Sequence, residues 1–274
     1  MSESGSRGAR LFGRYAFPPN ELGYCGPPGS EELLAELDSG EGGIDLVSRA
    51  RAFDGAWPYL EALAECGNIA DPLDDAVVRA YWVGSGLTDA VDPARLLARV
   101  QYAFAGQPGG VVHDIVGDSN CLAHHSFHVF AVYPWLKLVP RAGPQALSVL
   151  QQCRIRWGTV VQLDREQAVV RSRPLVFDGS VLSLGTEALE TVRWSADGRA
   201  LVDRPSEGDL VSMHWDWMCD RLTAPDVDAL DRCTDRALTL ANRYLKSDGD
   251  DGPVAPRSDP RTPGGTGAPA RRAW

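Results

Sequence analysis

Apolar residues in the first half of the chain recur three or four positions apart, the period of an amphipathic helix. Asp71-Pro72 offers a side-chain cap followed by a proline at the first helical position, and Asp92-Pro93 repeats this signal. The apolar residues after the first signal share one face: Leu73, Val77 and Tyr81. We expect five helices, one from about residue 44 and four over about 71–84, 92–106, 120–133 and 144–152. The short links between them favour a compact bundle.

After residue 152 the pattern changes to short runs rich in β-branched residues, which is typical of strands. Turn-forming residues at 164–166, 178–179 and 197–198 separate these runs. The predicted strands are 159–163, 168–172, a hairpin over 175–184, 190–194 and 210–215. Strands of this length and number favour a small closed barrel, because an open sheet would leave exposed edges. A helix from Thr223 to about Leu245 follows, with one apolar face: Val227, Leu230 and Leu238.

These patterns predict an α+β fold of two domains, an N-terminal helical bundle and a small OB-like β-barrel with a C-terminal helix. The predicted divisions are an N-terminal arm over 1–30, the helical domain over 31–152, the barrel and helix over 153–247, and a disordered tail over 248–274. Residues 12–28 mix aromatic residues with prolines and glycines, so we expect no long helix there. The tail has almost no apolar residues and cannot form a core.

Charge and cysteine content narrow the class of protein. The formal charge is −10, so the surface repels phosphate backbones and we expect no nucleic-acid partner. No run approaches the roughly 18 apolar residues that span a bilayer, and the polar N-terminus lacks the apolar centre of a signal peptide. Six scattered cysteines indicate reduced thiols in the cytoplasm. Hydrolase, phosphate-binding and dinucleotide motifs are missing, since Gly84-Ser85-Gly86 lacks the spacing of all three.

One cysteine and one histidine stand at opposite ends of the β-rich part. Cys153 opens the segment 153–161, and His214 closes the segment 208–214. A small barrel can bring the thiol and the imidazole together as a sulfur and nitrogen ligand pair for iron, copper or zinc. The alternative is that Cys153 is a small buried residue and His214 a hydrogen-bonded strand residue.

The two segments that carry these residues resemble the HypC family of [NiFe]-hydrogenase assembly chaperones. The spacing from Cys153 to Gly158 is similar to the family's opening, in which Pro-Gly follows a cysteine after a few residues. Segment 208–214, Gly-Asp-Leu-Val-Ser-Met-His, is similar to the family's Gly-Asp-x-Val-x-x-His strand. The resemblance covers residues 153–247 only. In this chain Cys153 follows a long N-terminal part instead of standing at the N-terminus, and Trp157 takes the place of the family's proline.

The resemblance implies a function in hydrogenase maturation. It implies that Cys153, with His214, binds an iron fragment carrying cyanide and carbonyl ligands, for delivery to a hydrogenase. The implied partner is the hydrogenase large subunit or another maturation protein. Such a protein is a chaperone-like carrier and not an enzyme, and iron is then a transferred fragment.

A second group of candidate ligands lies in the first half of the chain. Cys121, His124 and His128 fall within two turns of the predicted helix 120–133, where His124 and His128 would share a face. Histidines four residues apart bind metal in zinc proteases, although the glutamate of those enzymes is missing here. The group predicts a metal-binding enzyme as an alternative function. The plainer alternative is that these histidines and His125 hydrogen-bond their neighbours.

Cys25 is a further candidate ligand, within the run Pro-Pro-Asn-Glu-Leu-Gly-Tyr-Cys-Gly-Pro of residues 18–27. Segments of this kind line clefts or dock on partners, and the alternative is an arm packed across the bundle. The run, joined to a similar C-terminal part, resembles an uncharacterised actinobacterial protein family without an assigned activity. Apart from these ligand candidates, a third functional alternative is a structural adaptor that keeps the barrel and has lost the ligand.

Overall fold

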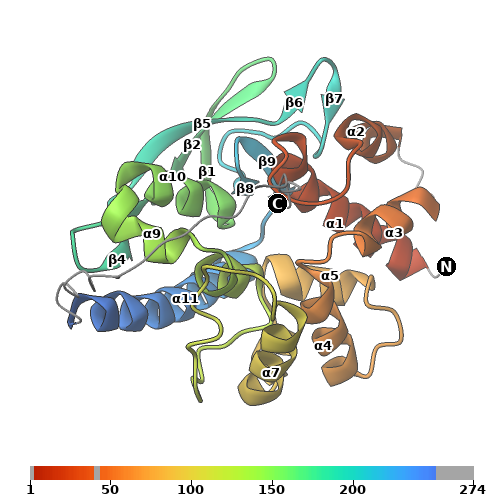
Figure 1. The fold of residues 1–274 in the computed structure, drawn as a ribbon. Helices are drawn as coiled ribbons and strands as arrows, with labels where there is room; N and C mark the ends of the chain where they lie inside the picture. Colours follow the sequence, from red (N-terminus) through yellow and green to blue (C-terminus); the bar gives the residue numbers. More distant parts are fainter. Residues whose placement is uncertain (1–2, 40–43, 251–274) are drawn as a thin grey trace, which may run out of the picture.

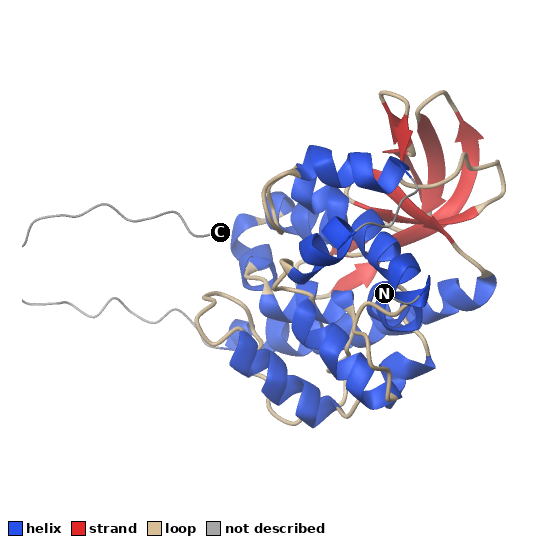
Figure 2. Cartoon of the chain, turned by 90° about the vertical axis from the view of Figure 1, so that its right-hand side faces the viewer, coloured by secondary structure: helices blue, strands red, loops and turns tan. Residues whose placement is uncertain are grey.

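The computed structural model describes residues 3–39 and 44–250 of the 274-residue chain. Helices form the N-terminal part, and a sheet followed by a long helix forms the C-terminal part, so the fold is α+β (Figure 1). The strands gather at one end of the molecule and helices fill the rest (Figure 2). The helices before the sheet are α1 (Glu3–Glu21), α2 (Ser30–Ser39), α3 (Ile44–Arg51), α4 (Trp57–Gly67), α5 (Asp75–Trp82), α6 (Gly86–Ala90), α7 (Pro93–Ala103), α8 (His125–Phe127), the π-helix η1 (His128–Val132), α9 (Trp135–Ala142) and α10 (Pro144–Cys153).

The N-terminal segment is mostly helix, so the expectation of no long helix within residues 12–28 was wrong. The α1 helix includes Pro18 and Pro19. Phe12, Tyr15 and Phe17 are buried on this helix, which packs against α5 and against the strands β8 and β9 described below. Burial of these aromatic side chains outweighs the cost of the prolines, which lie near the end of the helix and so remove few of its hydrogen bonds.

One predicted helix start is confirmed, and another helix begins later in the chain than predicted. The α7 helix begins directly after its N-cap Asp92, as predicted. The α5 helix begins at Asp75, later than predicted, because the side chain of Asp74 provides the cap. Asp71 instead caps the turn before it, where it accepts a hydrogen bond from the N–H of Leu73. The predicted helix over 144–152 is confirmed as α10.

The predicted continuous helix over residues 120–133 was wrong. His124 is extended, with φ −142° and ψ 148°, and the short α8 helix begins only after it. The next residues form the π-helix η1, and Tyr133 is extended again. The carbonyl of Ala131 accepts hydrogen bonds from the N–H groups of Val111 and Val112, which lie outside the helix. π-Helical turns are rare and frequently occur at functional sites.

Five strands form a strongly curved sheet in the order β1-β2-β5-β9-β8, and β8 pairs back with β1. The β5–β9 link is one parallel pair, Arg193 with Trp217, whereas the other neighbours pair over at least four residues. Because so little joins β5 to β9, complete closure into an OB-like barrel stays a prediction. The strands are β1 (Arg156–Leu163), β2 (Gln167–Ser172), β3 (Leu175–Phe177), β4 (Leu182–Leu184), β5 (Ala188–Arg193), β6 (Ser195–Ala196), β7 (Arg199–Ala200), β8 (Leu210–His214) and β9 (Trp217–Arg221).

The predicted turns are confirmed, whereas the short strands β6 and β7 and the longer β9 were not among the predicted strands. Asp178-Gly179 joins β3 to β4, and Asp197-Gly198 joins β6 to β7. The unpredicted strand β9 pairs with β8 through a tight turn at Trp215-Asp216. This turn places β9 beside β8 and fixes the position of His214 at the end of the strand.

The helical part and the sheet share one large hydrophobic cluster. It contains Phe12 and Leu60 of the helices together with Leu175 and Trp217 of the strands, so the predicted division into two domains at residue 152 stays a prediction. A smaller cluster fills the concave side of the sheet: Val160, Ala168, Val170, Val192, Val202, Val211, Met213 and Met218.

The last helix, α11 (Ala224–Asp250), runs past the predicted start of the tail at residue 248. Leu230 and Leu238 are buried on it, as predicted. The rest of the predicted tail, 251–274, lies outside the described residues. In the part of the chain that the structure describes, no helix combines the length and the apolar character needed to cross a membrane.

Candidate metal centre

Three side chains with metal-binding atoms meet where the helices join the sheet. His125 begins α8, Cys153 ends α10 and His214 ends β8. One donor atom of each lies within 4.8 Å of the other two, and all three residues are buried. No other group of three such donors meets this condition among the side chains that the structure describes. The fold therefore brings together Cys153 and His214, the pair selected from the sequence, and adds His125.

Cys153 lies at the point where the chain leaves a helix and enters the sheet. Arg154 ends α10 because its ψ of 149° is extended, and the cysteine is only 6% exposed. Burial raises the pKa of the Cys153 thiol well above its ordinary value, so the thiol is neutral in the metal-free protein. A metal ion binds the thiolate, and binding at this cysteine must therefore release a proton.

The imidazole of His214 is oriented by a backbone carbonyl of α1. Its Nδ1–H donates to the oxygen of Tyr15 over 2.6 Å. In a regular helix this carbonyl would accept from the residue four positions later, but that residue is Pro19, which has no N–H. The proline in α1 therefore leaves an acceptor free for His214.

The second ring nitrogen of His214 is then available as a ligand. With the proton on Nδ1, Nε2 carries a lone pair, and it has no hydrogen-bond partner although it is buried. The carbonyl of Cys153 lies beside the ring and opposes the fall in pKa, but a bare nitrogen cannot donate to it. Burial, the main cause, lowers the pKa of His214 well below its ordinary value. A histidine with one nitrogen held by a carbonyl and the other free is the usual arrangement of a metal ligand.

His125 has protein partners on both ring nitrogens. Nε2 lies 3.0 Å from the oxygen of Cys153 and must donate to it, because a carbonyl only accepts. Nδ1 lies 3.2 Å from the Tyr81 hydroxyl and accepts from it. Burial lowers the pKa of His125 to about 4, so the ring is neutral at pH 7. Nδ1 is thus a possible third ligand, on condition that the Tyr81 hydroxyl turns away.

The donor set fits a transition-metal ion. A tetrahedral ion with metal–nitrogen bonds of about 2.0–2.1 Å and a metal–sulfur bond of about 2.3 Å holds its ligand atoms about 3.3–3.6 Å apart. Donor atoms that lie within 4.8 Å of one another need to approach by at most about 1.5 Å to reach this geometry. One sulfur and two imidazole nitrogens suit iron, copper or zinc, and three protein ligands leave a coordination position open.

The second predicted ligand group does not form the arrangement that its spacing suggested. His124 is the N-cap of α8, where its Nδ1 accepts from the N–H of Ser126, so it does not share a helix face with His128. Nδ1 of His128 lies 3.2 Å from the Tyr59 hydroxyl. Burial raises the pKa of the Cys121 thiol to about 12. Within the described side chains, these three residues are not gathered as ligands.

His125 is the site residue that sequence reasoning named but did not select. The assumption of a regular helix paired His124 with His128 and left His125 on another face. The extended conformation of His124 changes this, because it places the start of the helix at His125. No local sequence signal marked this start, because histidine is not among the preferred N-cap residues, although its Nδ1 accepts the capping hydrogen bond here.

Cys25 lies in the irregular segment after α1, next to this cluster. Its neighbour Tyr24 stacks on Trp215, the residue after His214, with ring centroids 4.3 Å apart. The side-chain amide of Asn20 donates to the carbonyl of Cys25 and so holds the segment in place. Burial raises the pKa of the Cys25 thiol to about 12. Cys25 is not among the three donors that lie within 4.8 Å of one another.

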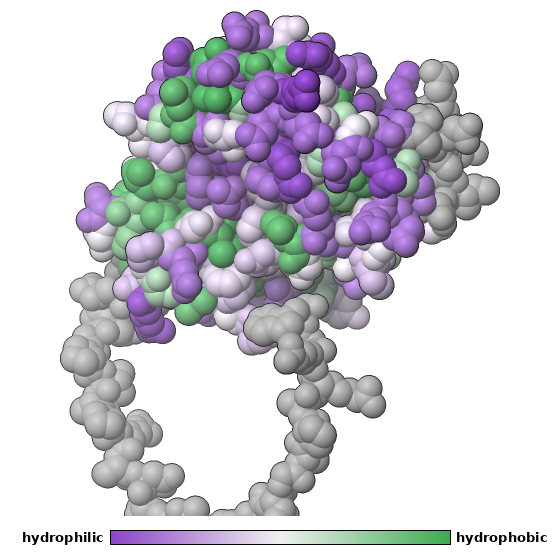
Figure 3. Space-filling view, turned by 90° about the horizontal axis from the view of Figure 1, so that it is seen from above, coloured by the Kyte–Doolittle hydropathy of each residue, from purple (hydrophilic) through white to green (hydrophobic). Residues whose placement is uncertain are grey.

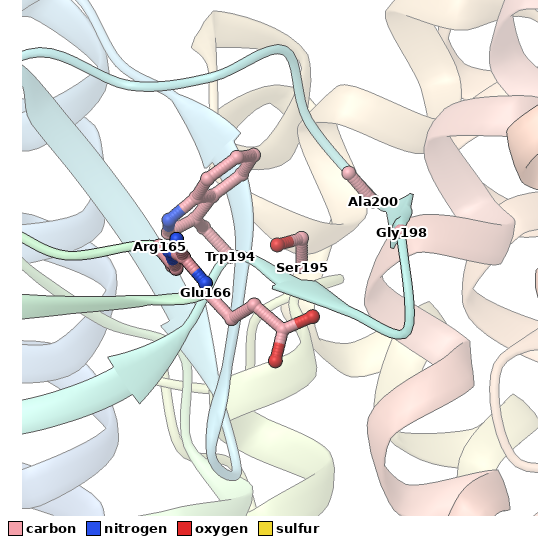
Figure 4. A pocket seen from close by; sticks show the side chains of 6 residues that line it. All are labelled: Arg165, Glu166, Trp194, Ser195, Gly198 and Ala200. Carbon is pink, nitrogen blue, oxygen red and sulfur yellow. The ribbon is translucent and has the colours of Figure 1, made fainter.

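A surface depression lies away from these residues. It has a volume of about 540 Å³ and is lined by Arg165, Glu166, Trp194, Ser195, Gly198 and Ala200. Glu166 and Ser195 lie between the Trp194 ring and the β6–β7 turn (Figure 4). Most of the residues that line this hollow are exposed or half-buried, and hydrophilic residues predominate on the face of the molecule seen from above (Figure 3). The buried donors, and not this hollow, are therefore the better candidate for chemistry.

Comparison with known proteins gives a family and no activity. No curated protein and no solved structure gave a significant match. Residues 4–248 match the model of a family described as "Family of unknown function (DUF6390)". The match includes His125, Cys153 and His214 and extends over both the helices and the sheet. The chain therefore belongs to the DUF6390 family.

Proposed function

We propose that the protein is an accessory protein of [NiFe]-hydrogenase maturation in the cytoplasm, which binds an iron fragment or a hydrogenase precursor through Cys153 and the curved sheet. The observation that supports this proposal most is the meeting of Cys153 with His214. These two residues carry the resemblance to the HypC family, and their donor atoms lie within 4.8 Å of each other. They are about sixty positions apart in the chain, so the fold, and not the sequence neighbourhood, brings them together.

The number and kind of ligands favour a carrier over a closed structural site. Structural zinc sites use four protein ligands, whereas this cluster offers at most three. An iron fragment with cyanide and carbonyl groups brings several ligands of its own and needs few from the protein. The thiolate of Cys153 would supply an anionic sulfur, and the imidazoles of His125 and His214 would supply neutral nitrogens. Iron is the cargo in this scheme.

Loading requires a local opening, because Cys153 is only 6% exposed. The irregular segment after α1 lies next to the cluster, and its residues Leu22 and Tyr24 are each 48% exposed. Tyr24 contacts Trp215 beside His214. A movement of this segment would uncover the site, and its exposed apolar side chains would then meet the partner that delivers or accepts the fragment.

Copurification tests this proposal. We expect the protein, isolated from cells that make a [NiFe]-hydrogenase, to carry iron or the hydrogenase large subunit. Cys153→Ala should abolish both. Cys233→Ala is the matched control, because Cys233 is another buried cysteine, on α11, that is not part of the cluster. Iron and large subunit retained by Cys153→Ala would contradict the proposal. A stable partner complex that never contains metal and ignores both substitutions would favour the structural adaptor.

A metalloenzyme is the second candidate function. The open coordination position favours it, because catalytic metal sites keep one position for water or substrate. Its ligands would be His125, Cys153 and His214, and not the group of Cys121, His124 and His128 predicted from the spacing. Tightly held metal that is never transferred to a hydrogenase would support this candidate.

A further inference from the structure

Arg156 is a buried arginine whose guanidinium contacts both segments that carry the metal-binding residues. It is 1% exposed and stands at the start of β1. Nη1 donates to the carbonyls of Gln151 and Gln152, over 3.3 Å and 3.1 Å. Nη2 donates to the carbonyl of Trp215 over 2.5 Å. One side chain thus reaches three backbone carbonyls that belong to two different parts of the fold.

These carbonyls flank the proposed ligands directly. Gln151 and Gln152 are the last residues of α10 before Cys153, and Trp215 follows His214 at the end of β8. The N–H of Trp215 also donates to the carbonyl of Gln152 over 2.8 Å. The end of α10 and the β8–β9 turn are therefore joined by one backbone hydrogen bond and by the hydrogen bonds of the Arg156 guanidinium. Arg156 therefore ties the backbone beside Cys153 to the backbone beside His214.

The joined turn is strained, so it needs such a restraint. Trp215 has a φ of +52°, a left-handed conformation that bulky side chains rarely adopt. Strained residues persist where surrounding contacts fix them, and they gather at functional sites. Here the contacts are the Arg156 guanidinium on the carbonyl of Trp215 and the Tyr24 ring stacked on its indole.

The positive charge of Arg156 is balanced by the carboxylate of Glu190. Nε donates to the carboxylate of Glu190 over 3.0 Å, and the Ser172 hydroxyl donates to the same carboxylate. The guanidinium uses Nε, Nη1 and Nη2 at once, in the fixed planar geometry that only arginine provides. A lysine ammonium would keep the charge near Glu190 but could not reach all the carbonyls.

We infer that Arg156 is a positioning residue of the metal centre, which sets the distance between Cys153 and His214 by holding the backbone beside each. The inference rests on the proposed metal binding, because it explains how that site keeps its geometry. Cations also interact favourably with the carbonyls at a helix C-terminus, which is where Arg156 contacts α10.

The neighbouring Arg154 offers a matched control. It is also 1% exposed, but it donates to the side chain of Gln151 and to the carbonyl of Arg173. Neither of these hydrogen bonds reaches the backbone carbonyls of Gln152 or Trp215. Arg154→Lys and Arg156→Lys therefore disturb the same buried region, while only Arg156→Lys releases the carbonyls of Gln152 and Trp215.

The test compares both lysine variants of the full chain with the unaltered protein, using Co²⁺ as the probe ion. We expect Arg156→Lys to lower the Co²⁺ affinity by about tenfold to a hundredfold, as for other residues that orient metal ligands, and to change the visible Co²⁺ spectrum. Arg154→Lys should leave both near those of the unaltered protein. Equal losses in the two variants, with equal spectra, would overturn the inference.

Hydrogen exchange at the N–H of Trp215 separates this inference from the proposed function. In metal-free protein we expect this N–H to exchange about tenfold faster in Arg156→Lys, because local opening governs exchange. Arg154→Lys should not change it. If the unaltered protein binds no Co²⁺, the proposed function fails, and faster exchange confined to Arg156→Lys still supports the positioning role. Unchanged exchange in Arg156→Lys refutes it.

Discussion

Mild acid should destabilise this protein strongly, because several of its histidines are buried in the neutral form. Burial lowers the pKa of His124 and His128 to about 3 and that of His125 to about 4. In the unfolded chain a histidine has a pKa of about 6.5 and takes up a proton as the pH falls below this value. Native stability is therefore fully present above pH 6.5 and is lost as the pH falls toward 4.

The size of the loss in unfolding free energy follows from these pKa values. At pH 5 an unfolded histidine is almost fully protonated, whereas a buried one with a pKa of about 3 or 4 is not. The difference is about 2 kcal/mol per histidine, or about 6 kcal/mol for the three. His214 adds to it, because its pKa is also lowered. Asp220 and Asp235 oppose the trend, since burial raises the pKa of both carboxyl groups. The net loss is comparable with the whole stability of a typical domain, about 5–15 kcal/mol.

Urea unfolding followed by circular dichroism at pH 7 and pH 5, with a chelator present, measures this effect. We expect a fall of about 6 kcal/mol or outright unfolding at pH 5. His128→Gln removes one buried titrating group and should reduce the fall by about 2 kcal/mol. Stabilities that agree within about 1 kcal/mol at the two pH values would refute the argument, because the histidines would then be protonated in the native state.

Two further predictions concern the ligand His125 and the packing of the sheet. Tyr81→Phe removes the hydroxyl that occupies Nδ1 of His125, so Co²⁺ affinity should rise several-fold in a titration. Tyr59→Phe, which removes the equivalent hydroxyl from another buried histidine, should leave it unchanged, and equal effects would exclude Nδ1 of His125 as a ligand. Gly158→Ala places a Cβ 2.3 Å from a backbone oxygen of β2 and should cost about 1–3 kcal/mol of unfolding free energy. Gly86→Ala meets nothing within 4 Å and should be nearly neutral, so a similar loss in both would contradict the packing argument.

Local signals in the sequence were sufficient for the hairpins and for several helices. Asp178-Gly179 and Asp197-Gly198 mark turns through their own conformational preferences, and Asp92 caps a helix through its own side chain. These features depend on a few neighbouring residues. They can therefore be predicted without knowledge of the rest of the fold.

Features that depend on distant contacts were missed. The α1 helix keeps its prolines because the fold buries its aromatic face, and β9 is recognisable only beside β8. The site shows the same limit. Cys153 and His214 were selected from the sequence, but His125 joins them through the unusual start of α8. The acceptor that orients His214 is a carbonyl nearly two hundred positions away, which no local pattern can indicate.

Titration of the metal-free protein with Co²⁺ tests the central claim most directly. The account predicts one ion bound per chain, with a sulfur-to-cobalt charge-transfer band in the ultraviolet that is absent in Cys153→Ala and present in Cys233→Ala. Intense visible bands would report the tetrahedral environment that His125, Cys153 and His214 can provide. No bound cobalt, or the same charge-transfer band in Cys153→Ala, would contradict the account.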